Sequence, residues 1–204
     1  MTVLVIQLSG VAVFLIVTLV LGVSLRRRRE ARYGETLSRV SHLAFWFGLV
    51  LPWAVGLFVP GPAALDRLVG LPPLPLPLWL RIAAGGVLLV AGVAVMQLSI
   101  SRLGHAGRGA PALKLTSAVV ESGLYAVVRN PMALGFYVGL LGGAVLSGST
   151  YVLLYTCLSV IPVHLLNLRF FEELELTLRY GESYERYRGS TPFLIPRLRP
   201  RAVD

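Results

Sequence analysis

Residues 121–137 read ESGLYAVVRNPMALGFY, a short polar element that lies between long apolar segments. An acidic pair, Glu172 and Glu173, follows after one further apolar segment. Proline is favoured in the first turn of a helix because its φ angle is already set and it needs no hydrogen-bond donor, so Pro131 marks the start of a helix. We expect the chemistry of the protein where this element and the acidic pair meet.

The composition around this element is that of a membrane protein. The 204 residues are 55% hydrophobic with a mean hydropathy of +0.73, and the apolar residues come in runs rather than at amphipathic spacing. The formal charge is +9. Basic residues that flank membrane spans more often set the topology and contact anionic headgroups than bind nucleic acid, so no nucleic-acid partner is expected. The single cysteine, Cys157, excludes an intramolecular disulfide and a zinc cluster, and no metal site is predicted.

Five apolar segments reach or approach the roughly 20 residues that a helix needs to cross the hydrocarbon core. They cover about residues 3–25, 42–59, 78–100, 132–146 and 151–171, and the fourth is short. Six prolines between residues 60 and 77 predict an irregular extramembrane connection. The sequence therefore predicts an all-α integral membrane protein of about five transmembrane helices. Residues 1–77 form a two-span N-terminal region with this loop, and residues 78–204 form the membrane core with a C-terminal amphipathic segment.

The basic residues predict the orientation of the chain. With five spans, all of the 19 Lys and Arg residues except Arg67 and Arg81 fall on one side. Short loops rich in Lys and Arg stay in the cytoplasm. We therefore expect a multi-pass protein of the cell (inner or cytoplasmic) membrane with its N-terminus outside, its C-terminus in the cytoplasm and a site that faces the cytoplasm.

Helical spacing selects candidate residues in the fifth span. At about 100° per residue, Glu172 lies about 80° around the helix from His164, and Glu173 about 180°. Asn167 lies about 60° from His164 on a face that is otherwise apolar. Polar groups at that depth face a cavity or another helix. For the acidic pair, a surface ion pair with Arg169 is the alternative to a site.

Other candidates lie in the loops and near the C-terminus. Gly107 and Gly109 allow backbone donors to face a ligand. Arg129 either anchors the chain to headgroups or holds a carboxylate with its planar fork. Tyr184 and Tyr187 either seal a pocket from below or anchor an interfacial helix.

The fourth span carries glycines at four-residue intervals. Gly135, Gly139 and Gly143 have the small-xxx-small spacing that lets helix backbones approach closely in lipid. We expect all three to serve packing, and Gly135 to serve the site as well.

The stretches ESGLYAVVRNPMALG (121–135) and FFEELELTLRYGESYERYRGSTPFLIPRL (170–198) carry a resemblance. From residue 107 to 198 the chain resembles the isoprenylcysteine carboxyl methyltransferase family, its bacterial relatives and, more distantly, the phospholipid N-methyltransferases. Asn130, Ala133 and Leu124 depart from the histidine, tyrosine and proline of the family pattern. The positions that match are Ser122, Gly123, Tyr125, Val128, Arg129, Pro131, Gly135, Glu172, Glu173, Gly181, Tyr184, Tyr187, Pro192 and Pro196.

The resemblance implies S-adenosylmethionine as the cofactor. The residues expected to bind it are Gly107, Gly109, Tyr125, Arg129, Asn130, Pro131, Gly135, Glu172 and Glu173. Asn167, Tyr184 and Tyr187 are expected to contact the substrate. Arg129, Glu172 and His164 are the candidate catalytic residues.

The predicted function is methyl transfer to a lipophilic small molecule or a membrane lipid, at a carboxylate or an amine. The sequence leaves the acceptor atom and the oligomeric state open. Two alternatives have similar layouts: an NADPH-dependent membrane reductase of the sterol type, and an inactive scaffold that keeps the fold.

Overall fold

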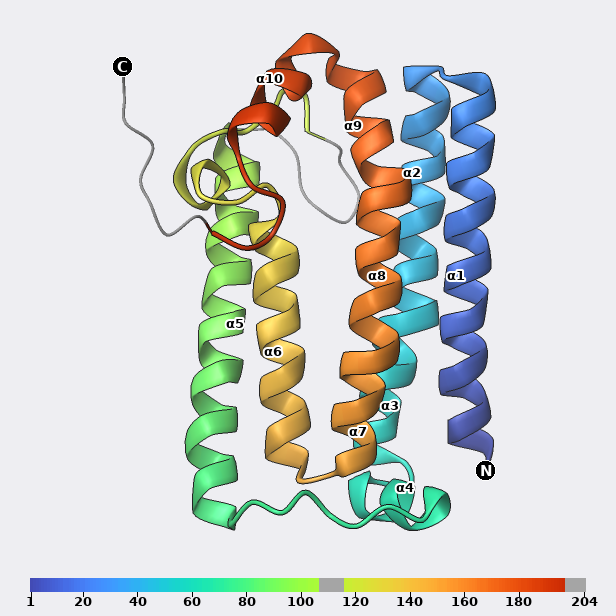
Figure 1. Ribbon diagram of the computed structural model, residues 1–204, viewed down its shortest axis with the longest axis vertical. Coiled ribbons are helices and arrows are strands. Elements are labelled where there is room, and N and C mark those ends of the chain that lie inside the picture. Colours follow the sequence, from blue (N-terminus) through green and yellow to red (C-terminus); the bar gives the residue numbers. More distant parts are fainter. Residues whose placement is uncertain (107–115, 197–204) are drawn as a thin grey trace.

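The computed structural model describes residues 1–106 and 116–196, and Gly107 and Gly109 lie outside these ranges. The described residues contain helices and no β-strand (Figure 1). The α-helices are α1 (Thr2–Arg28), α2 (Ala31–Phe45), α3 (Leu51–Phe58), α4 (Pro62–Val69), α5 (Leu78–Ala106), α6 (Pro131–Ser147), α7 (Thr150–Tyr155), α8 (Ile161–Asn167), α9 (Glu173–Tyr180) and α10 (Glu182–Ser190).

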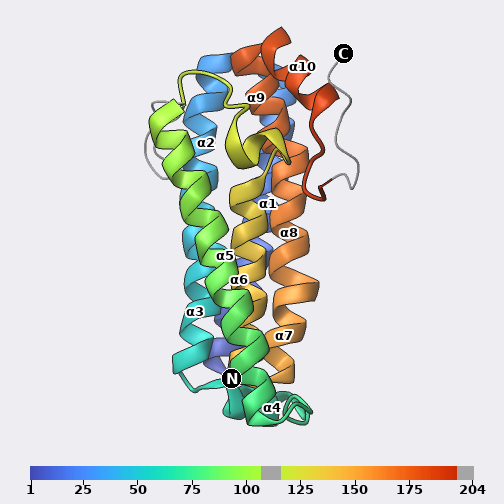
Figure 2. The ribbon, with the colours of Figure 1, turned by 90° about the vertical axis from the view of Figure 1, so that its left-hand side faces the viewer.

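Several of these helices join end to end into long rods. A π-helical turn at Trp46–Val50 joins α2 to α3, and two more at Thr156–Val160 and Leu168–Glu172 join α7, α8 and α9. The rods stand beside α1, α5 and α6 in one bundle, with α4 at one end and α10 at the other (Figures 1 and 2). The bundle therefore brings α2 and α9 together although they are far apart in the sequence.

Four of the helical rods are long and apolar enough to cross a membrane: Thr2–Arg28, Ala31–Phe58, Leu78–His105 and Thr150–Tyr180. The apolar helix α6 has 17 residues and is shorter, with a length of about 25 Å. Because α6 stops short of the ends of α5 and α9, residues 116–130 and α10 fill the space beyond its first turn (Figure 1). The all-helical membrane architecture expected from composition is thus present in the described residues.

Two boundaries differ from the sequence-based prediction. The second rod begins at Ala31 and not near residue 42, because its polar first turns bury Gly34, Leu37 and Ser38 inside the bundle, where α2 packs on α9. The proline-rich connection is not irregular throughout, since it contains α4. Pro62 lies in the first turn of α4, where a proline needs no hydrogen-bond donor.

The two ends of the bundle carry different charges. Arg67 on α4 and Arg81 on α5 belong to the α4 end, and the Arg81 Nη2 donates a hydrogen bond to the carbonyl of Leu146 near the end of α6. The other arginines among the described residues belong to segments at or near the α10 end. This separation agrees with the charge pattern from which the five-span topology was predicted.

Glycines set the close packing of α5 on α6. A Cβ atom on Gly142 would lie 2.4 Å from the backbone nitrogen of Leu89, and one on Gly135 would lie 2.6 Å from the backbone nitrogen of Met96. Gly139 has open space at its Cβ position, and Gly143 faces the ring of Trp53. The four-residue spacing therefore predicted close helix packing, but the α6 positions that exclude a side chain against α5 are seven residues apart.

The variant Gly142→Ala is expected to lower the free energy of unfolding by about 1–3 kcal/mol, because its methyl group meets backbone atoms that move only with the whole helix. Gly139→Ala adds the same methyl group on the same helix where no atom lies within 4 Å. Thermal unfolding of both variants in detergent checks this. Equal melting temperatures for the two variants would contradict the packing described.

Candidate functional site

A cavity of about 510 Å³ lies between α2, α5, α6 and the α8–α9 rod, near the α10 end of the bundle. This volume falls in the range of roughly 300–1,000 Å³ that is usual for small-molecule sites. Residues 116–130 and α10 contribute the remaining walls. The cavity therefore lies where the two sequence stretches that carry the motifs come together.

One part of the cavity is apolar. Phe45 and Trp46 of the second rod, Met96 and Ile100 of α5, and Phe136 of α6 line it. The other part is polar and carries side chains from residues 116–130, α9 and α10. These segments, with Glu172 just before α9, contribute the polar lining residues Thr116, Tyr125, Arg129, Asn130, Glu172, Glu175, Arg179, Tyr180, Tyr184 and Tyr187. Further polar lining residues come from α2 and α8: Ser38, Ser41, His42, His164 and Asn167.

Backbone hydrogen bonds fasten the segment after α10 to the loop before α6. The amide of Arg129 donates to the carbonyl of Pro192 at 2.8 Å, and the amide of Asn130 donates to that of Phe193 at 3.2 Å. The Asn130 side chain donates a second bond to the Phe193 carbonyl at 3.1 Å. The asparagine that replaces the family histidine thus has a structural partner here.

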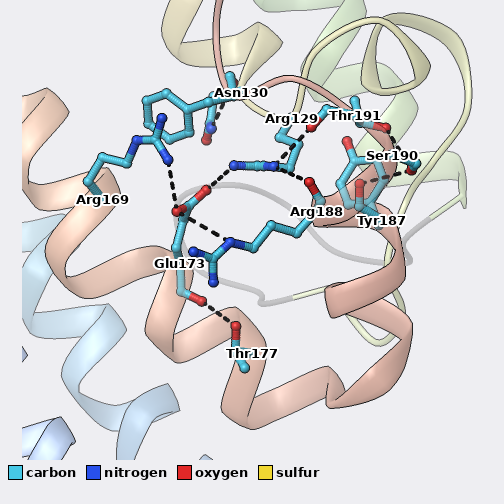
Figure 3. A network of polar contacts seen from close by, with 10 residues as sticks. Arg129, Asn130, Arg169, Glu173, Thr177, Tyr187, Arg188, Ser190 and Thr191 are labelled. Atoms are coloured by element: carbon cyan, nitrogen blue, oxygen red, sulfur yellow. Dashed lines mark hydrogen bonds and ion pairs between the residues drawn. The ribbon is translucent and has the colours of Figure 1, made fainter.

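Arg129 and Glu173 form a buried ion pair at the centre of this contact (Figure 3). The Arg129 Nη2 lies 2.5 Å from the Glu173 Oε1, and both side chains are 7% exposed. The Arg129 Nη1 donates to the carbonyls of Arg188 and Thr191 at 2.6 and 2.9 Å. Arg169 and Arg188 add weaker contacts to the same carboxylate at 3.4 and 3.9 Å. Arg129 therefore ties the start of α6 to α9 and to the end of α10.

The two residues of the acidic pair, Glu172 and Glu173, have different surroundings. Glu172 lines the cavity together with His164, whereas Glu173 is not among the lining residues and faces Arg129 instead. Within the described residues, no hydrogen bond or ion pair engages the Glu172 carboxylate. Glu172 is thus the acid of the pair whose oxygens are open to a ligand, in agreement with the angular spacing along the helix.

His164 and Asn167 lie at different positions along the cavity wall. The Nδ1 of His164 lies 2.9 Å from the hydroxyl of Tyr137, and its ring stacks on Phe45 with centroids 4.4 Å apart. The Asn167 side-chain nitrogen donates to the hydroxyls of Thr18 and Ser41 at 3.1 and 3.0 Å. His164 thus belongs to the apolar part of the cavity, and Asn167 joins its wall to α1 and α2.

Three tyrosines close the polar part of the cavity. Tyr125, Tyr184 and Tyr187 line it and are each less than a tenth exposed. The hydroxyl of Tyr187 donates to the carbonyl of Tyr125 at 2.7 Å. Burial raises the pKa of all three hydroxyls well above the usual value, so each remains a neutral hydrogen-bonding group at neutral pH.

Two residues expected at the cofactor site point elsewhere. Gly135 packs against the backbone of α5 and does not line the cavity, because it permits the close approach of the two helices. Pro131 is buried at the first turn of α6 and is also absent from the lining, although Asn130 and Met132 on either side of it are present. Gly107 and Gly109 are outside the described residues.

Sequence reasoning missed several residues of the cavity wall. Glu175 and Arg179 line it from α9, at three and seven residues after Glu172. This spacing places them on the same helix face, so periodicity from Glu172 would have found them. Ser38 and His42 also line it from α2; Ser38 lies before the predicted start of the second span at residue 42, and His42 lies at that start.

Comparisons with known proteins agree with this arrangement. The Protein-S-isoprenylcysteine O-methyltransferase of Schizosaccharomyces pombe is 36% identical over 84 residues, which cover 38% of this chain and 33% of the relative. The chain therefore aligns with about a third of that relative's length. No solved structure matches the chain at a significant level. The sequence pattern of the phospholipid methyltransferase family matches residues 80–183, just over half of the chain, which includes α5, α6 and the α7–α9 rod. The resemblance noted from the motifs is confirmed, and the chain belongs to the phospholipid methyltransferase family.

Proposed function

We propose that the protein transfers a methyl group from S-adenosylmethionine to a lipophilic small molecule or membrane lipid. The observation that carries this proposal is the two-part cavity. Its polar part holds the Glu172 carboxylate, which has no hydrogen-bond or ion-pair partner among the described residues, and its apolar part lies among Phe45, Trp46 and Phe136. A polar methyl donor and an apolar acceptor can therefore meet in one cavity.

The polar residues fit a cationic donor. S-adenosylmethionine carries a positive ammonium, a positive sulfonium and a negative carboxylate. Glu172 presents a carboxylate to the cavity, and the neutral tyrosines 125, 184 and 187 offer stacking surfaces and hydrogen bonds. We assign the cationic amino-acid end to Glu172, and we assign to Arg129 and Glu173 the task of holding the walls in place.

When bound, the donor supplies a methyl carbon whose bond to sulfur breaks, with the electron pair staying on sulfur, as the acceptor atom bonds that carbon. The protein's task is to align the two and to exclude water. For a carboxylate acceptor, opposite charges disappear as the bond forms, so a dry cavity of low dielectric constant favours the reaction. An amine acceptor must also lose a proton, and Glu172 or His164 would accept it.

The acceptor is proposed to enter from the lipid between α2 and α5. Trp46 lines the cavity and is also 49% exposed, so this wall reaches the outer surface of the bundle. The donor is proposed to arrive from the cytoplasm at the α10 end, since the described basic residues concentrate there. We therefore propose that the α10 end of this multi-pass protein faces the cytoplasm.

Ligand-dependent thermal shifts of the full chain in detergent test the proposal. S-adenosylmethionine and its demethylated product are expected to raise the melting temperature, since a ligand that binds only the folded state stabilises it. Stabilisation by NADPH alone would favour a reductase, and no response to any of the three would favour a scaffold. Incubation with methyl-labelled donor and membrane lipids, followed by mass spectrometry, then identifies the acceptor.

A further inference from the structure

Arg179 is a second arginine of the cavity, and its surroundings differ from those of Arg129. It lines the cavity from α9, two turns after Glu172. Its side chain is only 10% exposed. In Arg129 both terminal nitrogens are hydrogen-bonded and only the Nε is buried without a partner, whereas in Arg179 the Nε and Nη1 atoms are both buried without a hydrogen-bond partner among the described residues.

Two neighbouring side chains contact the Arg179 guanidinium without accepting a hydrogen bond from it. The Glu175 Oε1 lies 3.2 Å from the Arg179 Nε, but this contact lacks the geometry of a hydrogen bond. The Arg179 Cζ lies 4.7 Å from the ring centroid of Tyr180, whose hydroxyl donates to the carbonyl of Thr116 at 2.5 Å. The guanidinium is therefore positioned before any ligand arrives.

An unpaired, buried guanidinium nitrogen loses its hydration and gains nothing in return. An anionic group in the cavity would supply the missing acceptor. A carboxylate is a strong acceptor for the unpaired Nη1 of Arg179, because a hydrogen bond between two charged groups is stronger than one between neutral groups. The geometry of Arg179 thus indicates an oxyanion of the ligand.

The charges of the cavity wall identify which oxyanion. Arg129 lines the cavity, but its charge is matched by Glu173. On the α8–α9 rod, the charged side chains that line the cavity are Glu172, Glu175 and Arg179, two negative and one positive, and Glu175 faces the Arg179 Nε at 3.2 Å. The methyl donor carries the opposite set, two positive groups and one carboxylate.

We propose that Arg179 binds the carboxylate of the methyl donor's amino-acid end, and that Glu175 acts as a positioning residue for Arg179. This inference rests on the proposed function, since it names a contact within the same site. Arg179 takes the role that the motif pattern had given to Arg129. The ammonium of the donor then lies toward Glu172, nearer the apolar part of the cavity.

The test compares S-adenosylmethionine with its decarboxylated analogue, using calorimetric binding to the purified full chain. Wild-type protein is expected to bind the analogue about 10- to 100-fold more weakly, because a charge-assisted pair is lost. In Arg179→Gln the affinity for S-adenosylmethionine is expected to fall by a similar factor, and the affinity for the analogue is expected to stay the same. The variant therefore loses the discrimination between the two ligands.

Two further variants keep the test decisive. Arg179→Lys keeps the charge but not the fork, and we expect intermediate discrimination even if Arg179→Gln does not fold. Arg186→Gln removes an exposed arginine of α10, 73% exposed in its side chain, and is expected to bind both ligands like wild type. If both Arg179 variants discriminate between S-adenosylmethionine and its decarboxylated analogue as strongly as wild type does, the inference is wrong.

The outcomes separate this inference from the proposed function. Suppose that wild-type protein binds S-adenosylmethionine and that the Arg179 variants still discriminate fully between S-adenosylmethionine and its decarboxylated analogue. If the KM of these variants for an anionic acceptor also rises, Arg179 contacts the acceptor and the inference is wrong. If wild-type protein does not bind S-adenosylmethionine, the proposed function itself fails, and with it the inference.

Discussion

The variant Glu172→Gln is expected to bind S-adenosylmethionine about 10- to 150-fold more weakly than wild type, a loss of about 1.5–3 kcal/mol. Glutamine has nearly the same shape but carries no charge, so it cannot offset the positive charge of the donor. Because the Glu172 carboxylate has no hydrogen-bond or ion-pair partner among the described residues, its replacement leaves no protein group unpaired. The fold is therefore expected to survive, and the melting temperature without ligand should not fall.

Calorimetric binding and methyl transfer at saturating acceptor measure this effect. The matched control is Glu182→Gln, which removes an acid of α10 whose side chain is 93% exposed and which pairs with Arg186 only at 3.9 Å. Such a surface pair contributes little. Wild-type affinity in Glu172→Gln would mean that the acid facing the cavity does not contact the donor.

The second large effect is expected from Arg129→Met, which leaves the buried Glu173 carboxylate without its closest partner. Removing one member of a buried ion pair costs about 3–5 kcal/mol, because the remaining charge is left uncompensated. We expect about 3 kcal/mol here, since Arg169 and Arg188 still lie within 4 Å of the same carboxylate. The melting temperature should fall, and methyl transfer should fall with it because the cavity wall loses its anchor.

A double variant distinguishes loss of charge balance from loss of shape. Arg129→Met combined with Glu173→Met removes both charges, and it is expected to be more stable than Arg129→Met alone. The corresponding surface pair, Glu182→Gln with Arg186→Gln, should leave the melting temperature unchanged. If Arg129→Met melts like wild type, the buried pair does not hold the two motif halves together.

Much of the fold followed from composition and spacing. Runs of apolar residues predicted an all-helical membrane protein, and Pro131 marked the start of α6. Gly181, one of the positions that matches the family pattern, ends α9 with a positive φ of 56°. The first turns of α2 were not predicted as part of the second span, because these turns are polar on one side and do not form an apolar run.

The site was predicted less completely, for a physical reason. Arg129 and Glu173 were both selected, but residue type and spacing do not reveal that two residues 44 positions apart use each other as partners. Tertiary packing determines which residues become partners. It also turns Gly135 toward α5, where the need for close backbone approach explains the glycine without a ligand.

The most direct test of the account is an experimental structure of the full chain with S-adenosylhomocysteine, the demethylated product. We expect ligand density in the cavity between α6, α9 and α10, with the amino group next to Glu172 and the carboxylate next to Arg179. Density outside this cavity, or an amino-acid end that lies away from Glu172, would contradict it.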